Sequence, residues 1–383
     1  MSMGEMQADY IVIGAGIAGT SIAYWLSKHE RVIVLERETQ PGYHSTGRSA
    51  ALFMESYGSP QVRALTSASR SFFERPPTGF CEHELLTSRG AMHFAYRGQE
   101  IELDAHEVLV RSVSRNVERL DAVEACLRVP VLRPENLLGA VYEADASDID
   151  VHALQQGFIR GARINGNRLV SNAEVRGLKR VAGAWEVATN QGTYHAPILV
   201  NAAGAWADTI GALAGAAPIG LVPKRRSALI FAPPQGVDTS DWPMFMDIEQ
   251  SFYVKPDAGM LLGSPANADP VEPHDVQPEE LDIAVAIDRI QSMTTLTVHR
   301  PSHVWAGLRS FVSDGEFVGG FDTAVPGFFW AAAQGGYGIQ TAPAVGQVYA
   351  AMLRGLPVPE QIAQFGVRAE ALSPARSNSS HQL

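Results

Sequence analysis

A glycine-rich turn between two short apolar stretches near the start of the chain constrains its fold most. Residues 8–13 (Ala-Asp-Tyr-Ile-Val-Ile) are typical of a buried parallel strand, and the glycine pattern Gly14–Gly19 follows at once. A helical stretch, Thr20–His29, comes next, and Arg31–Leu35 predicts a second strand with Glu36 at its carboxyl end. This order predicts a strand–turn–helix–strand unit that binds a dinucleotide.

Each residue type in this unit has a mechanical reason. Gly14 permits the tight turn, Gly16 lets the backbone approach a pyrophosphate, and Gly19 lets the helix and strand pack closely. The helix start presents free N–H groups and a positive dipole end to phosphates. Glu36 can accept hydrogen bonds from a ribose diol. The fingerprint alone does not separate FAD from NAD.

Composition narrows the class of protein further. The 383 residues carry a formal net charge of −11, which argues against a nucleic-acid partner because phosphate binding needs clustered Lys and Arg. The length predicts two domains, and no apolar run is long enough to span a membrane. Met1–Ala8 does not have the pattern of a secretory signal. Cys81 and Cys126 are expected to be buried, reduced thiols of a cytoplasmic protein.

Three later motifs favour FAD. Tyr43–Ala51 is a run of small and hydroxyl-bearing residues that can wrap phosphates and pass close to a flat ring, although such runs also form ordinary loops. Ile198–Trp206 predicts a strand that ends in a small-residue turn. Gly335–Thr341 leads into an expected helix, Ala342–Leu353, whose N–H groups could stabilise negative charge on a reduced flavin.

In this order the motifs resemble the D-amino acid oxidase superfamily of flavoproteins, which includes glycine and sarcosine oxidases. The resemblance runs from about Ala8 to about Ser373, and it is most detailed with the bacterial FAD-dependent D-arginine dehydrogenases. The stretches that carry it are Tyr43–Ala51, Pro60–Thr66, Gly79–His83, Pro223–Ala228, Lys255–Pro273 and Trp305–Phe311.

The resemblance implies an α/β fold with a Rossmann-like FAD-binding domain and an α+β substrate domain built on an antiparallel sheet. We expect the FAD-binding domain to comprise residues 1–80, 146–220 and 315–375, and the substrate domain residues 81–145 and 221–314. Alternation in Ala228–Ala232 and Ser251–Leu262 suits a half-buried antiparallel sheet. The polar end from Ser373, above all residues 376–383, is expected to be a disordered tail.

The resemblance also implies the residues that hold FAD, without a covalent bond, because neither cysteine lies in a matching motif. The expected cofactor residues are Gly14, Gly16, Ile17, Ala18, Gly19, Glu36, Arg37, Ser45, Thr46, Arg48, Ser49, Ala50, Ala51, Val175, Ala203, Gly204, Trp206, Gly335, Gly336, Tyr337, Gly338, Ile339, Gln340 and Thr341.

Four residues match those that hold the substrate α-carboxylate in D-arginine dehydrogenases: Tyr57, Arg226, Tyr253 and Arg309. Arginine forks and tyrosine hydroxyls suit a carboxylate because paired N–H groups match its two oxygens. Gly336 matches the residue whose backbone carbonyl meets the substrate nitrogen. Arg226 could instead belong to a solvated basic cluster, and Tyr253 to the core. No catalytic base is assigned to His44 or His93.

Two departures from the D-arginine enzymes concern the side-chain pocket. Ala91 stands where they have a glutamate that pairs with the guanidinium, and Leu52 where they have a histidine. A buried cation without a counter-charge is costly, so D-arginine and D-lysine should be poor substrates. Apolar or aromatic D-amino acids should be better, because the expected pocket residues are Leu52, Met54, Ala91, Met244 and Met246.

Alternatives stay open at this point. The chain could oxidise a secondary amine such as sarcosine, glycine or a cyclic imino acid, or a 2-hydroxy acid, or it could be a flavin-binding subunit that needs a partner. The electron acceptor is expected to be a quinone or another acceptor, with oxygen left open. Peripheral attachment to the inner membrane is an alternative to a free cytoplasmic protein.

Overall fold

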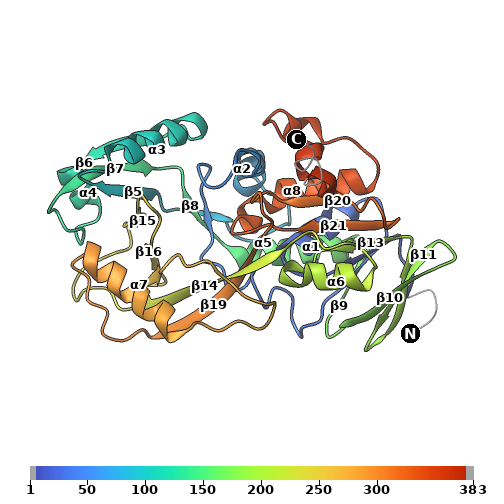
Figure 1. Cartoon of the computed structure of the whole chain (residues 1–383). Coiled ribbons are helices and arrows are strands. Elements are labelled where there is room, and N and C mark those ends of the chain that lie inside the picture. The colour runs from blue at the N-terminus through green and yellow to red at the C-terminus, as the bar shows by residue number, and fades with distance from the viewer. Residues whose placement is uncertain (1–5, 377–383) are drawn as a thin grey trace, which may run out of the picture.

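A parallel sheet forms one half of the molecule. The computed structural model describes residues 6–376 and is drawn in Figure 1. Within those residues the sheet has the order β20–β21–β13–β1–β2–β9, and only β20 runs antiparallel to its neighbour. The strands are β1 (Tyr10–Ile13), β2 (Val32–Leu35), β9 (Arg168–Val170), β13 (Ile198–Asn201), β20 (Val318–Phe321) and β21 (Phe328–Ala332). The strands β1, β2 and β21 are buried along their whole length, as a sheet covered on both faces requires.

Different elements cover the two faces of this sheet. On one face the core joins β1 and β2 to α1 (Ile17–Leu26) and α8 (Gly338–Leu353), against which α2 (Pro60–Glu74) and α5 (Val151–Ile164) pack. The core of the other face contains Trp185 and Tyr194. These belong to a three-stranded layer, β10 (Val175–Val181), β11 (Ala184–Thr189) and β12 (Gly192–Ala196), next to α6 (Ala207–Leu213). The short helices η2 (Gly204–Trp206), α9 (Glu360–Ala363) and α10 (Ala369–Leu372) complete this half.

A larger mixed sheet forms the other half, on the left of Figure 1. Its order is β18–β14–β17–β16–β15–β5–β7–β6, with β19 paired to β14. The strands are β5 (Ala91–Tyr96), β6 (Val117–Asp121), β7 (Leu137–Glu143), β14 (Val222–Phe231), β15 (Met244–Asp247), β16 (Tyr253–Asp257), β17 (Met260–Ser264), β18 (Asp269–Pro270) and β19 (His303–Phe311). All pairs are antiparallel except β5 with β15, so the expectation of an antiparallel sheet needs that one correction. The domain boundaries expected from the sequence stay a prediction.

The faces of the larger sheet have different neighbours, which decides where a cavity can form. Helices α4 (Ala122–Arg128) and α7 (Glu280–Met293) pack on the face that carries Phe94 and Phe245. On the opposite face α3 (Glu100–Val113) covers one part, through Leu103 and Val110. The remainder of that face carries Met244, Met246 and Tyr253 and is free to line a cavity. A small sheet of β3 (Leu52–Phe53), β8 (Ser147–Ile149) and β4 (Leu86–Ser88) lies between the two halves.

Several boundaries differ from those expected. Residues 251–262, expected to lie in an antiparallel sheet, contain β16 and the first part of β17, because Ala258 and Gly259 adopt left-handed conformations (φ +48° and +78°) that turn the chain between them. Helices α1 and α8 begin earlier than expected, at Ile17 and Gly338.

The chain ends also bear on the expectations. The polar end is not wholly disordered, because Arg376 pairs with Asp314 at 2.9 Å. The rest of the expected tail, residues 377–383, and residues 1–5 of the opening segment lie outside the described residues. No helix in the described chain combines the length and the hydropathy needed to cross a membrane.

Candidate flavin and substrate site

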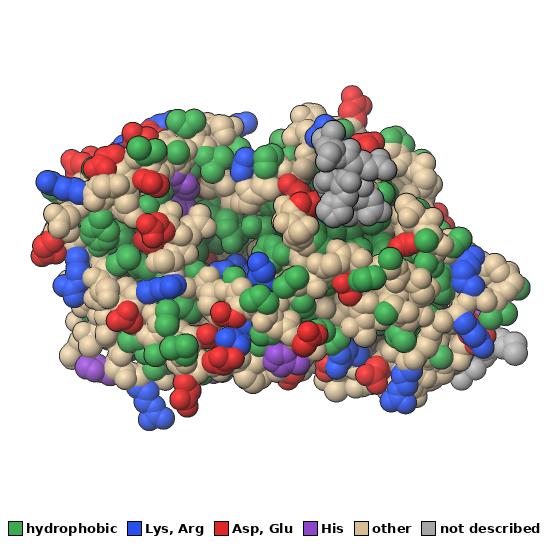
Figure 2. All heavy atoms as spheres, viewed as in Figure 1, with side chains coloured by type: hydrophobic (Ala, Val, Ile, Leu, Met, Phe, Trp, Pro, Cys, Tyr) green, Lys and Arg blue, Asp and Glu red, His purple; other side chains and the backbone are tan. Residues whose placement is uncertain are grey.

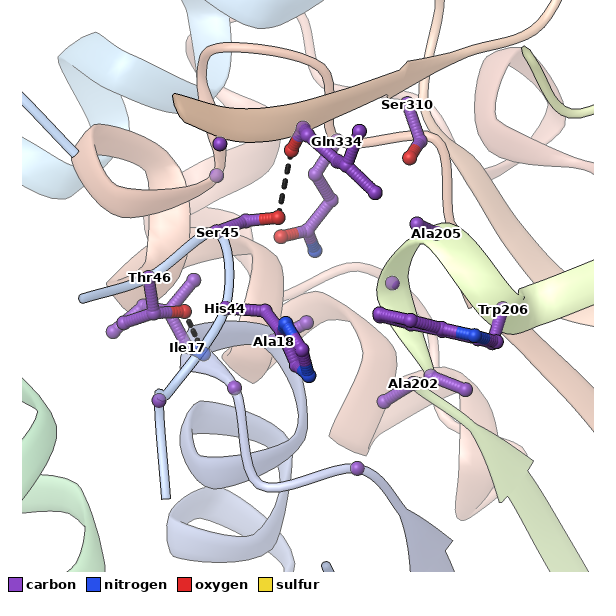
Figure 3. A pocket seen from close by; sticks show the side chains of 18 of the residues that line it. Ile17, Ala18, His44, Ser45, Thr46, Ala202, Ala205, Trp206, Ser310 and Gln334 are labelled. Atoms are coloured by element: carbon purple, nitrogen blue, oxygen red, sulfur yellow. Dashed lines mark hydrogen bonds between the residues drawn. The ribbon is translucent and has the colours of Figure 1, made fainter. Parts of the chain in front are cut away.

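A cavity of about 380 Å³ lies between the two large sheets. Its walls come from the β1–α1 turn, residues 42–50, residues 173–175, the segment after β13, strands β14 and β19, and residues 331–339. Figure 3 shows Ser45 and Thr46 on one side of it and Ala205 and Trp206 on the other. In Figure 2 the surface is hollowed between the two halves, where hydrophobic side chains surround Lys or Arg atoms.

The turn between β1 and α1 leaves no room for side chains. Gly14 has φ +102°, and a Cβ there would lie 2.4 Å from the Ala202 carbonyl oxygen. A Cβ on Gly19 would lie 1.9 Å from the Gly14 carbonyl oxygen. Gly16 is the N-cap of α1, and its backbone lines the cavity. The backbone N–H of Ile17 donates to Thr46 Oγ1 at 3.0 Å, so the segment 42–50 is tied to the helix start. This is a cradle into which a diphosphate fits.

The carboxylate of Glu36 orders the neighbouring end of the cavity. It accepts hydrogen bonds from the backbone N–H groups of Ala15 (2.7 Å) and Glu38 (2.9 Å) and is buried. Close by, the Arg37 guanidinium lies 4.8 Å from the centre of the Trp206 ring. A carboxylate fixed in this way still has lone pairs for a ribose diol, while Arg37 and Trp206 supply a flat surface.

The hydroxyl-rich segment is fastened to the larger sheet. Ser45 Oγ donates to the Leu308 carbonyl at 2.6 Å. The Arg48 guanidinium donates to the carbonyls of Val276 (2.9 Å) and Ala306 (3.2 Å) and pairs with Asp275. Arg48 therefore joins the two walls of the cavity.

Most of the expected cofactor residues line this cavity. They are Gly14, Gly16, Ile17, Ala18, Glu36, Arg37, Ser45, Thr46, Arg48, Ser49, Ala50, Val175, Ala203, Gly204, Trp206, Gly335, Gly336, Gly338 and Ile339. Gly19, Tyr337 and Thr341 line neither cavity described here. Thr341 Oγ1 donates to the Tyr337 carbonyl inside α8 at 2.9 Å and is buried, so its part is structural. Ala51 and Gln340 line a second, smaller cavity instead.

The second cavity, of about 110 Å³, shares several walls with the first. The residues that line both are Ser49, Ala50, Arg226, Tyr253, Arg309, Gly336 and Ile339. Tyr57 lines only the smaller one. The structure therefore brings together Tyr57, Arg226, Tyr253, Arg309 and Gly336 where the two cavities meet.

Two guanidinium groups without acidic partners dominate this junction. Arg309 donates to the Tyr57 hydroxyl at 3.3 Å, and Arg226 donates from Nε to the Asn267 carbonyl at 2.6 Å. Within residues 6–376 neither forms an ion pair with Asp or Glu. Burial, followed by repulsion from Arg309, lowers the pKa of Arg226 to about 10. Two neighbouring, poorly solvated cations of this kind form a site for an anion.

Most of the other side chains that line the smaller cavity are apolar, with Gln250 and Gln340 among the polar exceptions. Leu52, Met54, Met244 and Met246 line it, as expected from the sequence. Within the described chain no Asp or Glu lines it. Ala91 does not line it either, which corrects the expectation for that residue. Ala91 lies on β5, the strand next to β15 in the same sheet, and is buried in a cluster with Met54 and Ala146.

Sequence reasoning missed further lining residues, among them Gln250, Phe252 and Ala266. Phe252 lies inside the alternating stretch Ser251–Leu262 and Gln250 directly before it, so the hydrophobic pattern indicated this region but not which of its residues line the cavity. Gln250 and Ala266 have positive φ angles (56° and 50°), which the residue types Gln and Ala do not predict.

Of the histidines and cysteines considered from the sequence, His44 alone lines one of the two cavities. His44 lines the larger cavity, and its Nε2 donates to Glu38 Oε1 at 2.9 Å. His93 is buried against His106, away from both cavities. Cys81 and Cys126 are free and only half-buried, and neither lines a cavity. Among the described residues no cluster of His, Cys, Asp and Glu could hold a metal ion.

Comparison with known proteins agrees with this geometry. Residues 9–352 match the family model described as FAD dependent oxidoreductase (DAO). Glycine oxidase of Bacillus licheniformis is 28% identical over 371 residues, which cover 91% of this chain and 94% of that protein. Mitochondrial dimethylglycine dehydrogenase of Rattus norvegicus is 25% identical over 264 residues, 68% of this chain, but this chain spans only 31% of that protein's length.

Solved structures show the same fold. L-proline dehydrogenase from P. horikoshii superposes with a TM-score of 0.83 at 22% identity, covering 98% of both chains. Glycine oxidase from Geobacillus kaustophilus superposes with a TM-score of 0.80 at 22% identity, covering 95% of this chain and 99% of the other. With the glycine cradle, the fixed Glu36 carboxylate and the extended cavity, these matches identify FAD as the cofactor. The chain belongs to the family of FAD dependent oxidoreductases.

Proposed function

We propose that this protein oxidises D-amino acids with apolar or aromatic side chains at the carbon that carries the nitrogen. The observation that carries the proposal is the pair Arg226 and Arg309, which lies at the junction of the flavin cavity and a small apolar cavity and has no acidic partner within residues 6–376. Such a pair fits the α-carboxylate of an amino acid.

The residues at the junction of the two cavities hold different groups of the substrate. The two arginines bind the carboxylate, and the hydroxyls of Tyr57 and Tyr253 complete its hydrogen bonds. The backbone carbonyl of Gly336 accepts from the substrate amine. When bound, FAD would supply the two-electron oxidation by taking up a hydride from Cα, and the resulting imino acid would hydrolyse to a 2-oxo acid and ammonia. No protein nucleophile is needed, so the protein contributes chiefly position.

The apolar wall determines which side chain fits best. Leu52, Met54, Met244 and Met246 favour apolar groups through burial, worth about 25 cal/mol per Å². A cationic side chain would find no Asp or Glu among the described lining residues. We therefore place the chain near the D-arginine dehydrogenases within its family, with a preference shifted from cationic to apolar side chains.

Anaerobic mixing of the holoprotein with single amino acids tests the proposal. Bleaching of the oxidised flavin absorbance by D-leucine, D-methionine or D-phenylalanine, but not by their L-isomers or D-arginine, is expected. If D-arginine were the best substrate by kcat/KM, the pocket argument would fail while amine oxidation stood. If no amino acid bleached the flavin, the proposal itself would be wrong.

A second candidate is the oxidation of secondary or N-methylated amino acids. Proteins similar to this chain in sequence or fold support this candidate, because they include dimethylglycine dehydrogenase, L-proline dehydrogenase and iminodiacetate oxidase. The arginine pair suits these substrates equally. Bleaching by sarcosine or proline but not by primary D-amino acids would select this candidate. Oxidation of a 2-hydroxy acid would call for a proton acceptor next to the substrate. His93 lies outside both cavities, and His44 lines only the larger one, where it hydrogen-bonds Glu38.

The electron acceptor completes the proposed activity. We propose a quinone or another small acceptor, and oxygen uptake by the reduced protein measures the alternative. We also propose a cytoplasmic location, and fractionation of cells would detect any attachment to the inner membrane.

A further inference from the structure

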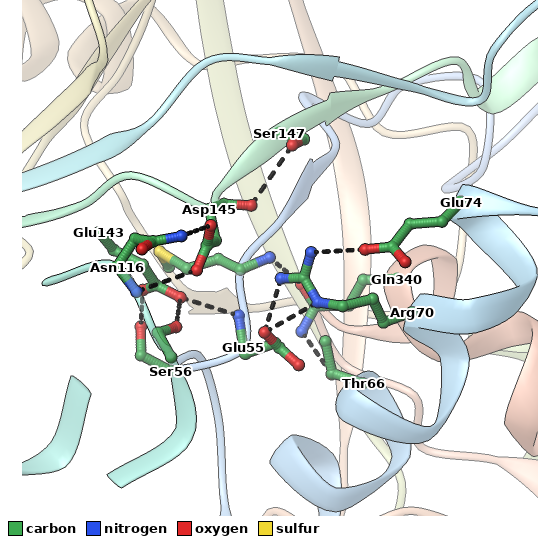
Figure 4. Close-up of polar contacts among 12 residues, drawn as sticks. Glu55, Ser56, Thr66, Arg70, Glu74, Asn116, Glu143, Asp145, Ser147 and Gln340 are labelled. Atoms are coloured by element: carbon green, nitrogen blue, oxygen red, sulfur yellow. Dashed lines mark hydrogen bonds and ion pairs between the residues drawn. The ribbon is translucent and has the colours of Figure 1, made fainter. Parts of the chain in front are cut away.

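Residues 52–57 form a wall of the substrate cavity that is fastened at three successive positions. Leu52, Met54 and Tyr57 line the cavity, and Tyr57 also meets Arg309. The Met54 N–H donates to Gln340 Oε1 of α8 at 3.3 Å. The Glu55 carboxylate accepts from Arg70 of α2 at 2.6 and 3.0 Å. The remaining contacts of Glu55 and Ser56 converge on one side chain, Glu143 (Figure 4).

Glu143 is the last residue of β7 in the larger sheet and is 1% exposed. Its Oε2 accepts from Ser56 Oγ at 2.5 Å, and its Oε1 accepts from the Glu55 N–H at 3.2 Å and from Ser114 Oγ. In the described chain this carboxylate has no ion pair with Lys, Arg or His. Within the described chain this buried carboxyl group is therefore held by hydroxyl and backbone donors.

A buried carboxylate without a cation is an expensive way to hold a fold together. Two of its three donors belong to the segment that ends in Tyr57, and the third, Ser114, belongs to the C-cap of α3. The carboxylate thus connects the larger sheet to the two residues directly before the tyrosine that meets Arg309. Moving Glu55 and Ser56 would move Tyr57, and with it the hydrogen bond that orients the Arg309 guanidinium.

Resting on the proposed function, we propose that Glu143 is a positioning residue for substrate binding. It fixes Glu55 and Ser56 so that Tyr57 and Arg309 hold the carboxylate of the substrate. It touches neither cavity and takes no part in the chemistry.

The two serines offer a matched pair of variants. Ser56→Ala and Ser114→Ala each remove one hydroxyl donor from the same carboxylate, but only Ser56 lies on the substrate segment. Glu143→Gln keeps the acceptor for the Glu55 N–H and can donate from its amide to Ser56 Oγ, so it should rescue binding. Glu143→Ala removes all three contacts.

The experiment measures benzoate binding to each holoprotein through the change in flavin absorbance, together with KM and kcat for D-leucine, flavin content and the unfolding midpoint. Benzoate probes the carboxylate site without turnover. We expect Ser56→Ala and Glu143→Ala to raise the Kd of benzoate and the KM by about tenfold, the loss of one hydrogen bond to a charged group. Ser114→Ala and Glu143→Gln should stay within about threefold of the wild type.

The outcomes are separable. Equal Kd values for the two serine variants, or wild-type binding by Glu143→Ala, would overturn the positioning role. Should Glu143→Ala fail to fold, the serine pair still decides. A wild type that binds benzoate but is bleached by no amino acid would refute the proposed function, while the serine comparison would still test Glu143. A wild type that binds no benzoate would overturn both.

Discussion

Three consecutive basic residues on β14 have three different environments. Arg225 pairs with Asp282 at 2.7 Å and with Glu279. The Lys224 ammonium lies 5.3 Å from the centre of the Phe311 ring. Arg226 donates to the Asn267 carbonyl at 2.6 Å, has no acidic partner within residues 6–376 and lines the smaller cavity. Strand alternation separates Arg225 from the other two, and of the three only Arg226 lines the two cavities, so it does not belong to a solvated basic cluster.

We predict that Arg226→Gln lowers kcat/KM for amino acids by about 10- to 150-fold, because it removes charge-assisted hydrogen bonds worth about 1.5–3 kcal/mol. Arg226→Lys should recover only part, since an ammonium cannot bind two oxygens in parallel. Steady-state kinetics on D-leucine with Lys224→Met as the control checks this. Equal losses in the Lys224 and Arg226 variants would contradict it.

Side-chain preference should follow charge at Leu52. This residue lines the cavity at the position where the D-arginine dehydrogenases have a polar side chain. Leu52→Glu should raise kcat/KM for D-lysine and D-arginine relative to D-leucine by at least about tenfold, since a partner offsets the cost of burying the cation. Leu52→Gln has nearly the same shape without the charge and is the control. If both variants change the ratio equally, shape rather than charge sets the preference.

The buried carboxyl of Glu143 should also affect stability. Burial raises its pKa from the ordinary value of 4.5, against hydrogen bonds from Ser114 and Ser56. A raised pKa in the folded state favours the protonated form, so its contribution to stability is full below pH 4.5 and is lost as the pH rises through the folded pKa. The unfolding free energy of Glu143→Gln, measured in urea, should therefore improve relative to the wild type between pH 4.5 and 7.5. A constant difference would contradict this.

At the scale of elements, local patterns were predictable and long-range contacts were not. The β1–α1–β2 unit follows from the sequence because strand, turn and helix are contiguous and each glycine answers a local steric demand. The alternation in Ser251–Leu262 indicated an antiparallel sheet but did not locate the turn between β16 and β17, although Asp257-Ala258-Gly259 carries a turn signal.

The substrate cavity depends on distant segments whose meeting no local pattern encodes. The walls of the smaller cavity include residues from 49–57, β15, β16 and β19. Family resemblance, rather than hydrophobic periodicity, indicated which residues of these segments belong to the site. The same resemblance placed Ala91 in the cavity, whereas the structure buries it against Met54 on the strand next to β15.

The packing of α3 on the larger sheet should weaken in acid. His93 of β5 and His106 of α3 lie with ring centres 4.0 Å apart, and the Nε2 atom of each has no hydrogen-bond partner in the described structure. Burial lowers the pKa of His106 from 6.5 to about 4, and burial with repulsion from His106 lowers that of His93 well below 6.5.

Because both folded pKa values are depressed, the stability from these neutral histidines is full above pH 6.5 and is lost as the pH falls towards 4. We expect His106→Leu to lose less unfolding free energy than the wild type over this range, by up to about 3 kcal/mol. Chemical denaturation at several pH values measures this, with the exposed His274→Leu as the control. Parallel curves for His106→Leu and the wild type would show that the pair does not drive acid sensitivity.

At the scale of the molecule, the flavin cavity lies at the interface between the two halves. Its lining residues come from both large sheets, and Arg48 and Ser45 tie one side to the other across it. A cofactor held at such an interface binds the folded chain and not the unfolded one. Its contribution to stability therefore follows the ratio of its free concentration to its Kd, at about 1.4 kcal/mol for each tenfold.

Gly14 offers a direct test of this coupling. Its φ of +102° and the 2.4 Å approach of a Cβ to the Ala202 carbonyl oxygen mean that Gly14→Ala must displace the turn that cradles the diphosphate. Gly177→Ala is the matched control, because Gly177 lies on β10 and its Cβ would meet only Ala188 Cβ at 3.9 Å. We expect added FAD to raise the unfolding midpoint of the stripped wild type and of Gly177→Ala progressively with concentration, while Gly14→Ala shows little or no shift. An equal shift of the unfolding midpoint in all three proteins would mean that the diphosphate lies elsewhere in the cavity. Contacts in the rest of the interface, rather than those at the glycine turn, would then supply most of the binding energy.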